Sequence, residues 1–126
     1  TESQWEYACR AGTTTAYSWG NDINASLANY DQSGLSQTRD VGHYAANSWG
    51  FFDMHGNVYE LTADHYGAFG SQSLVDPTGP TSGSGLVFRG GSWNNSNHFA
   101  RSAKRQYQSS EYRTETMGFR VGFQQQ

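Results

Sequence analysis

Side chains suited to recognition chemistry are concentrated in the last third of the chain, between Arg89 and Val121. Glycines, arginines and a tryptophan that look structural alternate there with short runs of unrelated polar and aromatic residues. Tyrosine offers contact area at a low cost in conformational entropy, and Asn, Ser, Thr and Gln supply adaptable hydrogen bonds, as in an antibody combining site. We therefore predict a ligand-binding surface over residues 93–117. The residues expected to form it are Trp93, Asn94, Asn95, Ser96, His98, Phe99, Lys104, Gln106, Tyr107, Gln108, Tyr112, Thr114, Glu115 and Thr116.

A second group of polar residues surrounds a glycine in the middle of the chain. The carboxylates of Asp53 and Glu60 flank the loop turned by Gly56. Carboxylate and carbonyl oxygens are the ligands that hard cations prefer, and calcium takes roughly six to eight of them. From the residues alone, two interpretations of this loop stay open: a cation site, or a turn that Asp53 merely caps.

The histidines and the single cysteine give less indication of a functional site. His43, His55, His65 and His98 are dispersed, and no pair has the helical spacing of a zinc protease. We expect His55, inside the glycine-turned loop, to be exposed. Cys9 excludes an internal disulfide, leaves the cellular compartment undetermined, and is interpreted as a packed thiol rather than a nucleophile.

The composition sets limits on the class of protein. A chain of 126 residues fits one domain, and a 15% aromatic content argues for a globular core despite only 35% hydrophobic residues. Fifteen glycines against two prolines predict many turns and little regular secondary structure. A net charge of −3 points to no nucleic-acid partner, and no apolar run reaches membrane-spanning length. Five of the eight basic residues follow residue 100, where we interpret them as hydrogen-bond anchors rather than an anion-binding face.

One helix and a few short strands must position these side chains. Thr1 and Gln4 have the spacing of a capping box, and Trp5, Ala8 and Cys9 share a face, so we predict a helix that Gly12 ends. Strand-like composition occurs at residues 58–62, 86–91, 100–103 and 117–123. Residues 13–46 and 67–85 have the composition of loops.

Four blocks of the chain resemble the C-terminal portion of the formylglycine-generating enzyme (sulfatase-modifying factor) family. They cover residues 1–12, 17–20, 50–62 and 89–121, and the last block opens with Arg89-Gly90-Gly91-Ser92-Trp93 and closes with Gly118-Phe119-Arg120-Val121. The resemblance implies an α+β, C-type-lectin-like fold, rich in loops. Residues 1–126 would form the C-terminal portion of such a domain, without the family's N-terminal strand and helix.

The same resemblance has consequences for metals. The catalytic family members bind copper through two cysteines, and the matching positions here are about Asn95 and Ala100, which offer no thiolate. We therefore expect no copper and no formylglycine-forming activity. The family also holds a calcium ion around its central block, which makes Ca²⁺ an expected cofactor. The matching ligands would be the carboxylates of Asp53 and Glu60 and the backbone carbonyls of Gly56 and Val58.

The alternation of anchors and varied residues also looks like the variable region of diversity-generating-retroelement proteins, which use this scaffold. Against this, adenine-directed mutation of asparagine codons cannot yield Lys104, Gln106, Gln108 or Glu115. The leading hypothesis is a non-catalytic module that binds a protein or another surface ligand. One alternative is an enzyme domain of the same family, of the sulfatase-modifying or iron-dependent sulfoxide-synthase type, with its metal ligands outside this chain. Another is a structural piece completed by an upstream fragment or a partner chain.

Overall fold

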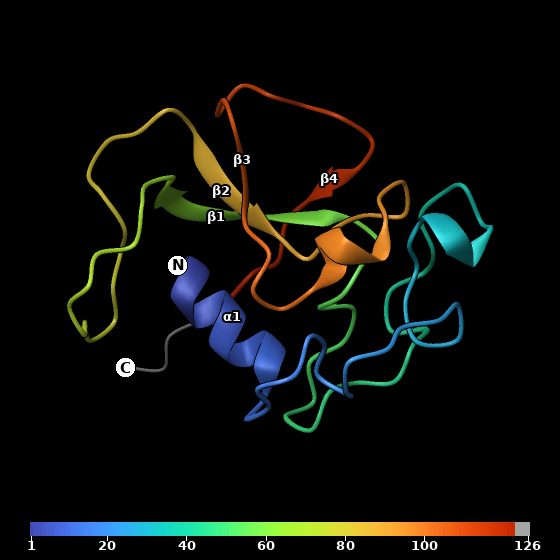
Figure 1. Cartoon of the computed structure of the whole chain (residues 1–126). Coiled ribbons are helices and arrows are strands. Elements are labelled where there is room, and N and C mark those ends of the chain that lie inside the picture. Colours follow the sequence, from blue (N-terminus) through green and yellow to red (C-terminus); the bar gives the residue numbers. More distant parts are fainter. Residues whose placement is uncertain (123–126) are drawn as a thin grey trace.

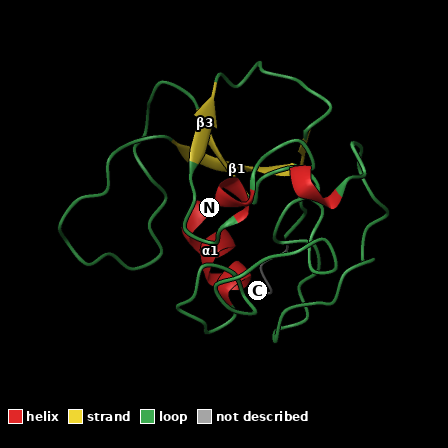
Figure 2. Cartoon of the chain, turned by 45° about the vertical axis from the view of Figure 1, so that its right-hand side comes forward, coloured by secondary structure: helices red, strands yellow, loops and turns green. Residues whose placement is uncertain are grey.

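One helix packs beneath a small mixed sheet, and loops make up most of the remaining chain (Figure 1 and Figure 2). The structure is a computed structural model that describes residues 1–122. Strand order in the sheet is β3-β2-β1-β4, with β2 antiparallel to both of its neighbours and β4 parallel to β1. This arrangement confirms the loop-rich α+β class. The elements in chain order are α1 (Glu2–Arg10), the 3-10 helix η1 (Asp31–Ser33), β1 (Tyr59–His65), β2 (Leu86–Arg89), the 3-10 helix η2 (Asn97–Ala100), β3 (Gln106–Gln108) and β4 (Met117–Gly118).

Helix α1 begins at the predicted capping box. The Thr1 hydroxyl accepts the backbone N–H of Gln4, and the Gln4 side chain accepts from the Thr1 nitrogen in return. The helix ends one residue before the predicted glycine, because Ala11 already takes the left-handed conformation with φ of 47°. Its buried face carries Trp5 and Cys9, which pack with the Met54 side chain to form the core cluster.

Strand β1 carries a bulge, at which its register with β2 shifts. Glu60 lies opposite Arg89 and Leu61 opposite Phe88, but His65 then lies opposite Leu86, so β1 has extra residues in between. Beyond the bulge, residues 66–85 form a long loop that extends to one side of the sheet (Figure 1). The predicted strands at 58–62 and 86–91 correspond to β1 and β2.

Two strand predictions near the end of the chain need correction. Residues 100–103 form no strand, because η2 ends at Ala100 and the next turn is fixed by loop contacts: the Ser102 N–H donates to Ala16 O at 2.8 Å. The strand predicted at 117–123 is limited to Met117–Gly118, and Arg120 instead turns toward Glu60. Phe123 lies outside the described residues. Strand β3 was not predicted, since Gln-Tyr-Gln has no apolar alternation.

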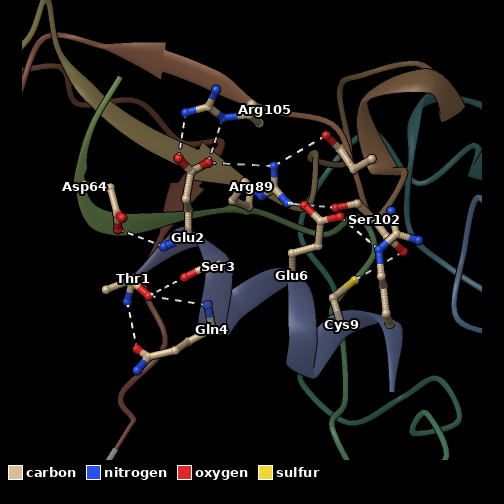
Figure 3. A network of polar contacts seen from close by, with 12 residues as sticks. Thr1, Glu2, Ser3, Gln4, Glu6, Cys9, Asp64, Arg89, Ser102 and Arg105 are labelled. Atoms are coloured by element: carbon tan, nitrogen blue, oxygen red, sulfur yellow. Dashed lines mark hydrogen bonds and ion pairs between the residues drawn. The ribbon is translucent and has the colours of Figure 1, made fainter. Parts of the chain in front are cut away.

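A network of buried charges joins α1 to the sheet (Figure 3). The Glu2 carboxylate accepts two hydrogen bonds from Arg105, at 2.7 and 2.6 Å, and its backbone N–H donates to Asp64 at 2.7 Å. Arg89 is 1% exposed and donates to the Glu6 carboxylate and, at 2.9 Å, to the carbonyl of Ser102. Charges this deeply buried are tolerated only when paired, so these residues fix the position of the helix on the sheet.

None of the helices within residues 1–122 has the length and apolar composition that crossing a lipid bilayer requires.

Candidate functional site

A hollow of about 360 Å³ opens beside β3 and β4, on the surface predicted to bind a ligand. Its buried side is formed by Tyr59 of β1 and Phe88 of β2, whose rings meet edge to face at 5.1 Å. Strand β3 and the segment that leads into β4 supply most of the remaining wall. Nine of the fourteen predicted binding residues line this hollow, namely Asn94, Asn95, Gln106, Tyr107, Gln108, Tyr112, Thr114, Glu115 and Thr116.

The other five predicted residues lie outside the hollow. His98 and Phe99 belong to η2, where their rings meet edge to face at 5.6 Å, and the Lys104 ammonium lies 5.3 Å from the centre of the Phe99 ring. Trp93 donates its backbone N–H to Asn57 O at 2.9 Å, and half-buried Ser96 immediately precedes η2. The predicted surface therefore divides into the hollow and a separate cluster around η2.

A stack of rings and a guanidinium holds Tyr107 in place at the edge of the hollow. Its ring lies 4.1 Å from that of Tyr66 at an interplanar angle of 20°. Arg105 lies over the other members of the stack, 4.8 Å from the Tyr66 ring and 4.0 Å from the Phe69 ring, while Glu2 fixes the guanidinium. Sequence reasoning missed Tyr66 and Phe69, because both lie in the 66–85 loop, where no periodicity predicts a contact with β3.

The base of the hollow carries an uncharged hydroxyl. Burial raises the pKa of Tyr59 to about 12, while a hydrogen bond from the Gln106 side chain acts in the opposite direction. Tyr59 is therefore a neutral phenol at physiological pH. Together with the amides and hydroxyls of the wall, it gives the hollow donors and acceptors without reactive groups.

The arginines that follow residue 100 act as anchors, in agreement with their interpretation from sequence. Arg105 and Arg120 form ion pairs with Glu2 and Glu60. Arg101 and Arg113 instead donate to backbone carbonyls: Arg101 to that of His98 at 3.3 Å, and Arg113 to those of Ser110 and Tyr112 at 2.7 and 2.8 Å.

All four predicted calcium ligands line a second hollow, of about 290 Å³, together with Arg120. Both oxygens of Glu60 are in use there: Arg120 donates to Oε1 at 2.6 Å and to Oε2 at 2.9 Å, and Trp5 also donates to Oε2. Asp53 accepts the backbone N–H of Gly42 at 2.6 Å. Within residues 1–122, no three His, Cys, Asp or Glu side chains gather closely enough to hold a metal.

This arrangement does not fit a bound calcium ion, because a guanidinium already neutralises the carboxylate that would have to bind it. The structure thus brings Asp53, Gly56, Val58 and Glu60 together but leaves Glu60 no oxygen free of a donor. Calcium binding stays a prediction that requires Arg120 to leave this carboxylate.

His55 is buried, at 4% exposure, and the expectation that it would be exposed is wrong. The loop is pressed into the body of the protein: Gly56 has φ of 81°, and an added Cβ would overlap the carbonyl of Asn29. The His55 Nδ1 atom lies 2.7 Å from the carbonyl of Ala100, which can only accept, so Nδ1 carries the proton. Nε2 then accepts the backbone N–H of Ser18 at 3.1 Å.

Cys9 lies against this histidine without forming a reactive pair. Its Sγ atom is 3.5 Å from His55 Nε2 and is fully buried. Burial raises the pKa of the Cys9 thiol to about 12 and lowers the pKa of His55 to about 4. Both groups are neutral near pH 7, so the pair lacks the thiolate that nucleophilic chemistry needs.

The two positions that match the family's copper-binding cysteines hold residues that contribute to the structure. Asn95 accepts a hydrogen bond from the Ser92 hydroxyl, and Ala100 is buried at the end of η2. Ser92 itself is 1% exposed.

Comparison with known proteins assigns the scaffold. Residues 1–124 match the family model of the sulfatase-modifying factor enzyme 1-like domain. A protein named serine/threonine-protein kinase pkn1 from Chlamydia caviae is 38% identical over 125 residues, which cover 95% of this chain and 20% of that protein. The formylglycine-generating enzyme of Mus musculus is 32% identical over 108 residues, covering 74% of this chain and 29% of the enzyme.

Among solved structures, Treponema denticola variable protein 1 superimposes with a TM-score of 0.85 and 34% sequence identity. The match covers 94% of this chain and 44% of that one. The chain thus spans less than half the length of each of these three proteins.

Proposed function

The chain belongs to the family of sulfatase-modifying factor enzyme 1-like domains, and we propose that it acts as a non-catalytic module that binds a ligand in the hollow beside β3. One observation carries the proposal. Nine residues chosen for their types in the sequence, and spread over residues 94–116, line a single hollow. Residues of these types also dominate natural binding loops, where rigid aromatic rings and adaptable amides act together.

The stack behind Tyr107 supports this role because it fixes a contact residue before the ligand arrives. A side chain already stacked on Tyr66, which Arg105 in turn covers, loses little conformational freedom on binding. Tyr112, which is 43% exposed, supplies a second ring at the same hollow. We propose that the ligand is a protein or another surface-bearing partner that reaches both tyrosines.

We further propose that the residues lining the hollow are the variable part of a diversified protein. Two findings favour this. One structural relative is named a variable protein, and the predicted binding residues that line the hollow are exposed or half-buried and lie between buried anchors such as Arg89 and Ser102. Sequencing the genomic surroundings tests the idea. Near-identical copies of the segment encoding residues 89–121 beside a reverse transcriptase are the expected result.

An enzymatic role is the second candidate, favoured by the 32% identity to a formylglycine-generating enzyme. In that case the metal ligands would come from outside this chain, since Asn95 and Ala100 offer no thiolate and Cys9 is buried and neutral at pH 7. Incubating the copper-loaded chain, together with the segment or partner that supplies those ligands, with a sulfatase-motif peptide under oxygen tests it. Conversion of the peptide cysteine to an aldehyde would establish the enzyme and remove the binding module as the main function.

A structural role is the third candidate. A large hollow of about 1030 Å³ separates α1 from the 66–85 loop, and apolar side chains at its rim are exposed: Tyr7 at 70%, Phe69 at 73% and Val75 at 93%. Exposed apolar groups gathered in one place mark a contact surface. An upstream fragment or a partner chain would cover them, and a monomeric, well-folded purified chain that binds no hydrophobic dye would argue against it.

Calcium binding is tested by titrating CaCl₂ into chelator-treated protein in a calorimeter. A heat of binding that grows in Arg120→Gln, where the Glu60 carboxylate is released, would support calcium at this loop. An absence of heat and of any rise in melting temperature in both proteins would remove the ion from the account.

The binding proposal itself is tested by a pull-down or ligand-array screen with wild-type protein and the double variant Tyr107→Ala/Tyr112→Ala. The matched control is Tyr7→Ala, which removes an exposed tyrosine of α1 outside the hollow. Ligands that bind wild type and the control but not the double variant are the expected result. Unchanged binding to the double variant would move the site elsewhere.

A further inference from the structure

The hollow beside β3 carries only one ionised side chain, that of Glu115. The remaining lining consists of phenols, amides, hydroxyls and apolar groups, none of which is charged near pH 7. Glu115 is exposed, and within the described part of the chain its carboxylate forms no ion pair. The hollow therefore presents an unneutralised negative charge to whatever enters it.

The basic residues nearby in the sequence are engaged elsewhere. Arg105 is held by the Glu2 carboxylate and lies over the Tyr66 and Phe69 rings, and Lys104 lies over the ring of Phe99. Arg113, in the same loop as Glu115, donates to backbone carbonyls of that loop. None of these three cations lines the hollow.

Resting on the proposed function, we infer that Glu115 selects the ligand: the hollow receives a cationic side chain, arginine or lysine, from the surface of a protein partner. An entering guanidinium or ammonium would meet the Glu115 carboxylate beside Tyr107 and Tyr112, which line the same hollow. A carboxylate attracts the cation, and the electron-rich faces of tyrosine rings add to that attraction. A phosphate or carboxylate ligand would meet repulsion from Glu115 and no cation among the lining residues.

The test uses a displayed library of random peptides, selected on the wild-type chain. Recovered peptides are synthesised, and their affinities are measured for wild type, for Glu115→Gln and for the matched control Glu111→Gln. The control removes an exposed carboxylate from the same loop that does not line the hollow. Each peptide is also made with its arginine or lysine replaced by glutamine, which completes a double-mutant cycle.

The expected result is that selected peptides carry an arginine or lysine. Glu115→Gln should weaken their binding roughly three- to tenfold, in line with a partly shielded ion pair, while Glu111→Gln has little effect. The peptide and protein substitutions should not be additive, and raising the salt concentration should weaken wild-type binding more than binding to Glu115→Gln.

Two other outcomes have separate meanings. Peptides that bind in the hollow, as shown by loss of binding in Tyr107→Ala/Tyr112→Ala, but that tolerate Glu115→Gln would overturn this inference and leave the proposed function standing. A selection that yields no peptide dependent on the two tyrosines would overturn the proposed function, and this inference with it.

Discussion

Replacing Arg89 with methionine should destabilise the whole domain, because this guanidinium joins α1 to β2. The side chain is 1% exposed, and it donates to the Glu6 carboxylate and to the carbonyls of Ser102 and Ala103. Methionine preserves an unbranched stem that can still pack against Trp5, whose ring lies 5.3 Å from the guanidinium carbon. The substitution therefore removes charge and hydrogen bonds with little loss of volume.

The expected loss of stability depends on which carboxylates keep a cationic partner after the substitution. Breaking a buried ion pair costs about 3–5 kcal/mol when a charge is left uncompensated. Here Glu2 keeps Arg105 at 2.6 Å and Glu6 keeps Arg10 at 2.8 Å, so the lower end applies, about 3 kcal/mol. For a domain of this size, that loss corresponds to a fall in melting temperature of roughly 10 °C.

Urea unfolding followed by tryptophan fluorescence measures the loss. The control is Arg113→Met, because Arg113 is exposed and donates only to carbonyls of its own loop, so its removal should cost about 0.5 kcal/mol or less. If Arg89→Met lies within about 1 kcal/mol of wild type, the reasoning on buried ion pairs is refuted here.

Three further predictions concern buried groups. Because the pKa of His55 is about 4 in the folded chain against 6.5 ordinarily, the unfolded state takes up the proton first as the pH falls. The free energy of unfolding should therefore decrease by up to about 3 kcal/mol between pH 6.5 and pH 4. Thermal melts of His55→Gln should show a flatter dependence on pH. Because the pKa of the Cys9 thiol is about 12, labelling by iodoacetamide at pH 8 should be orders of magnitude slower in native than in urea-unfolded protein, and equal rates would show an accessible thiol. Gly56→Ala should prevent folding or lower the free energy of unfolding by several kcal/mol, since the new methyl would overlap Asn29. Gly34→Ala, at φ of 77° with open space around it, should lower it by only about 1–2 kcal/mol. Unfolding followed by circular dichroism measures both, and similar losses in the two variants would contradict the steric argument.

The parts of the fold predictable from sequence are those with a local physical cause. The capping box of Thr1 and Gln4 starts α1 because both hydrogen bonds form within the first turn. The strands around Tyr59 and Val87 follow from β-branched and aromatic composition. Strand β3 could not be predicted in this way, because Gln106–Gln108 is polar and its pairing depends on β2, which lies some twenty residues earlier in the chain.

The candidate site shows the same division. The residue types that line the hollow could be selected from sequence, since tyrosines and amides between anchors are typical of binding loops. The stack that orients Tyr107 could not, because Tyr66 and Phe69 belong to the 66–85 loop, where no periodicity predicts a contact with β3. Likewise, the sequence separation of Glu60 and Arg120 gives no indication that the arginine forms an ion pair with this expected calcium ligand.

The central claim is that ligand binds in the hollow formed by β3 and the segment leading to β4. Amide hydrogen exchange with and without a captured ligand tests it most directly, because the exchange rate reports which backbone segments become protected. Binding beside β3 should slow exchange across residues 106–116 and leave α1 and residues 67–80 little changed. Protection confined to α1 and residues 67–80, with residues 106–116 unchanged, would place the binding surface at the hollow between α1 and the 66–85 loop and contradict binding beside β3.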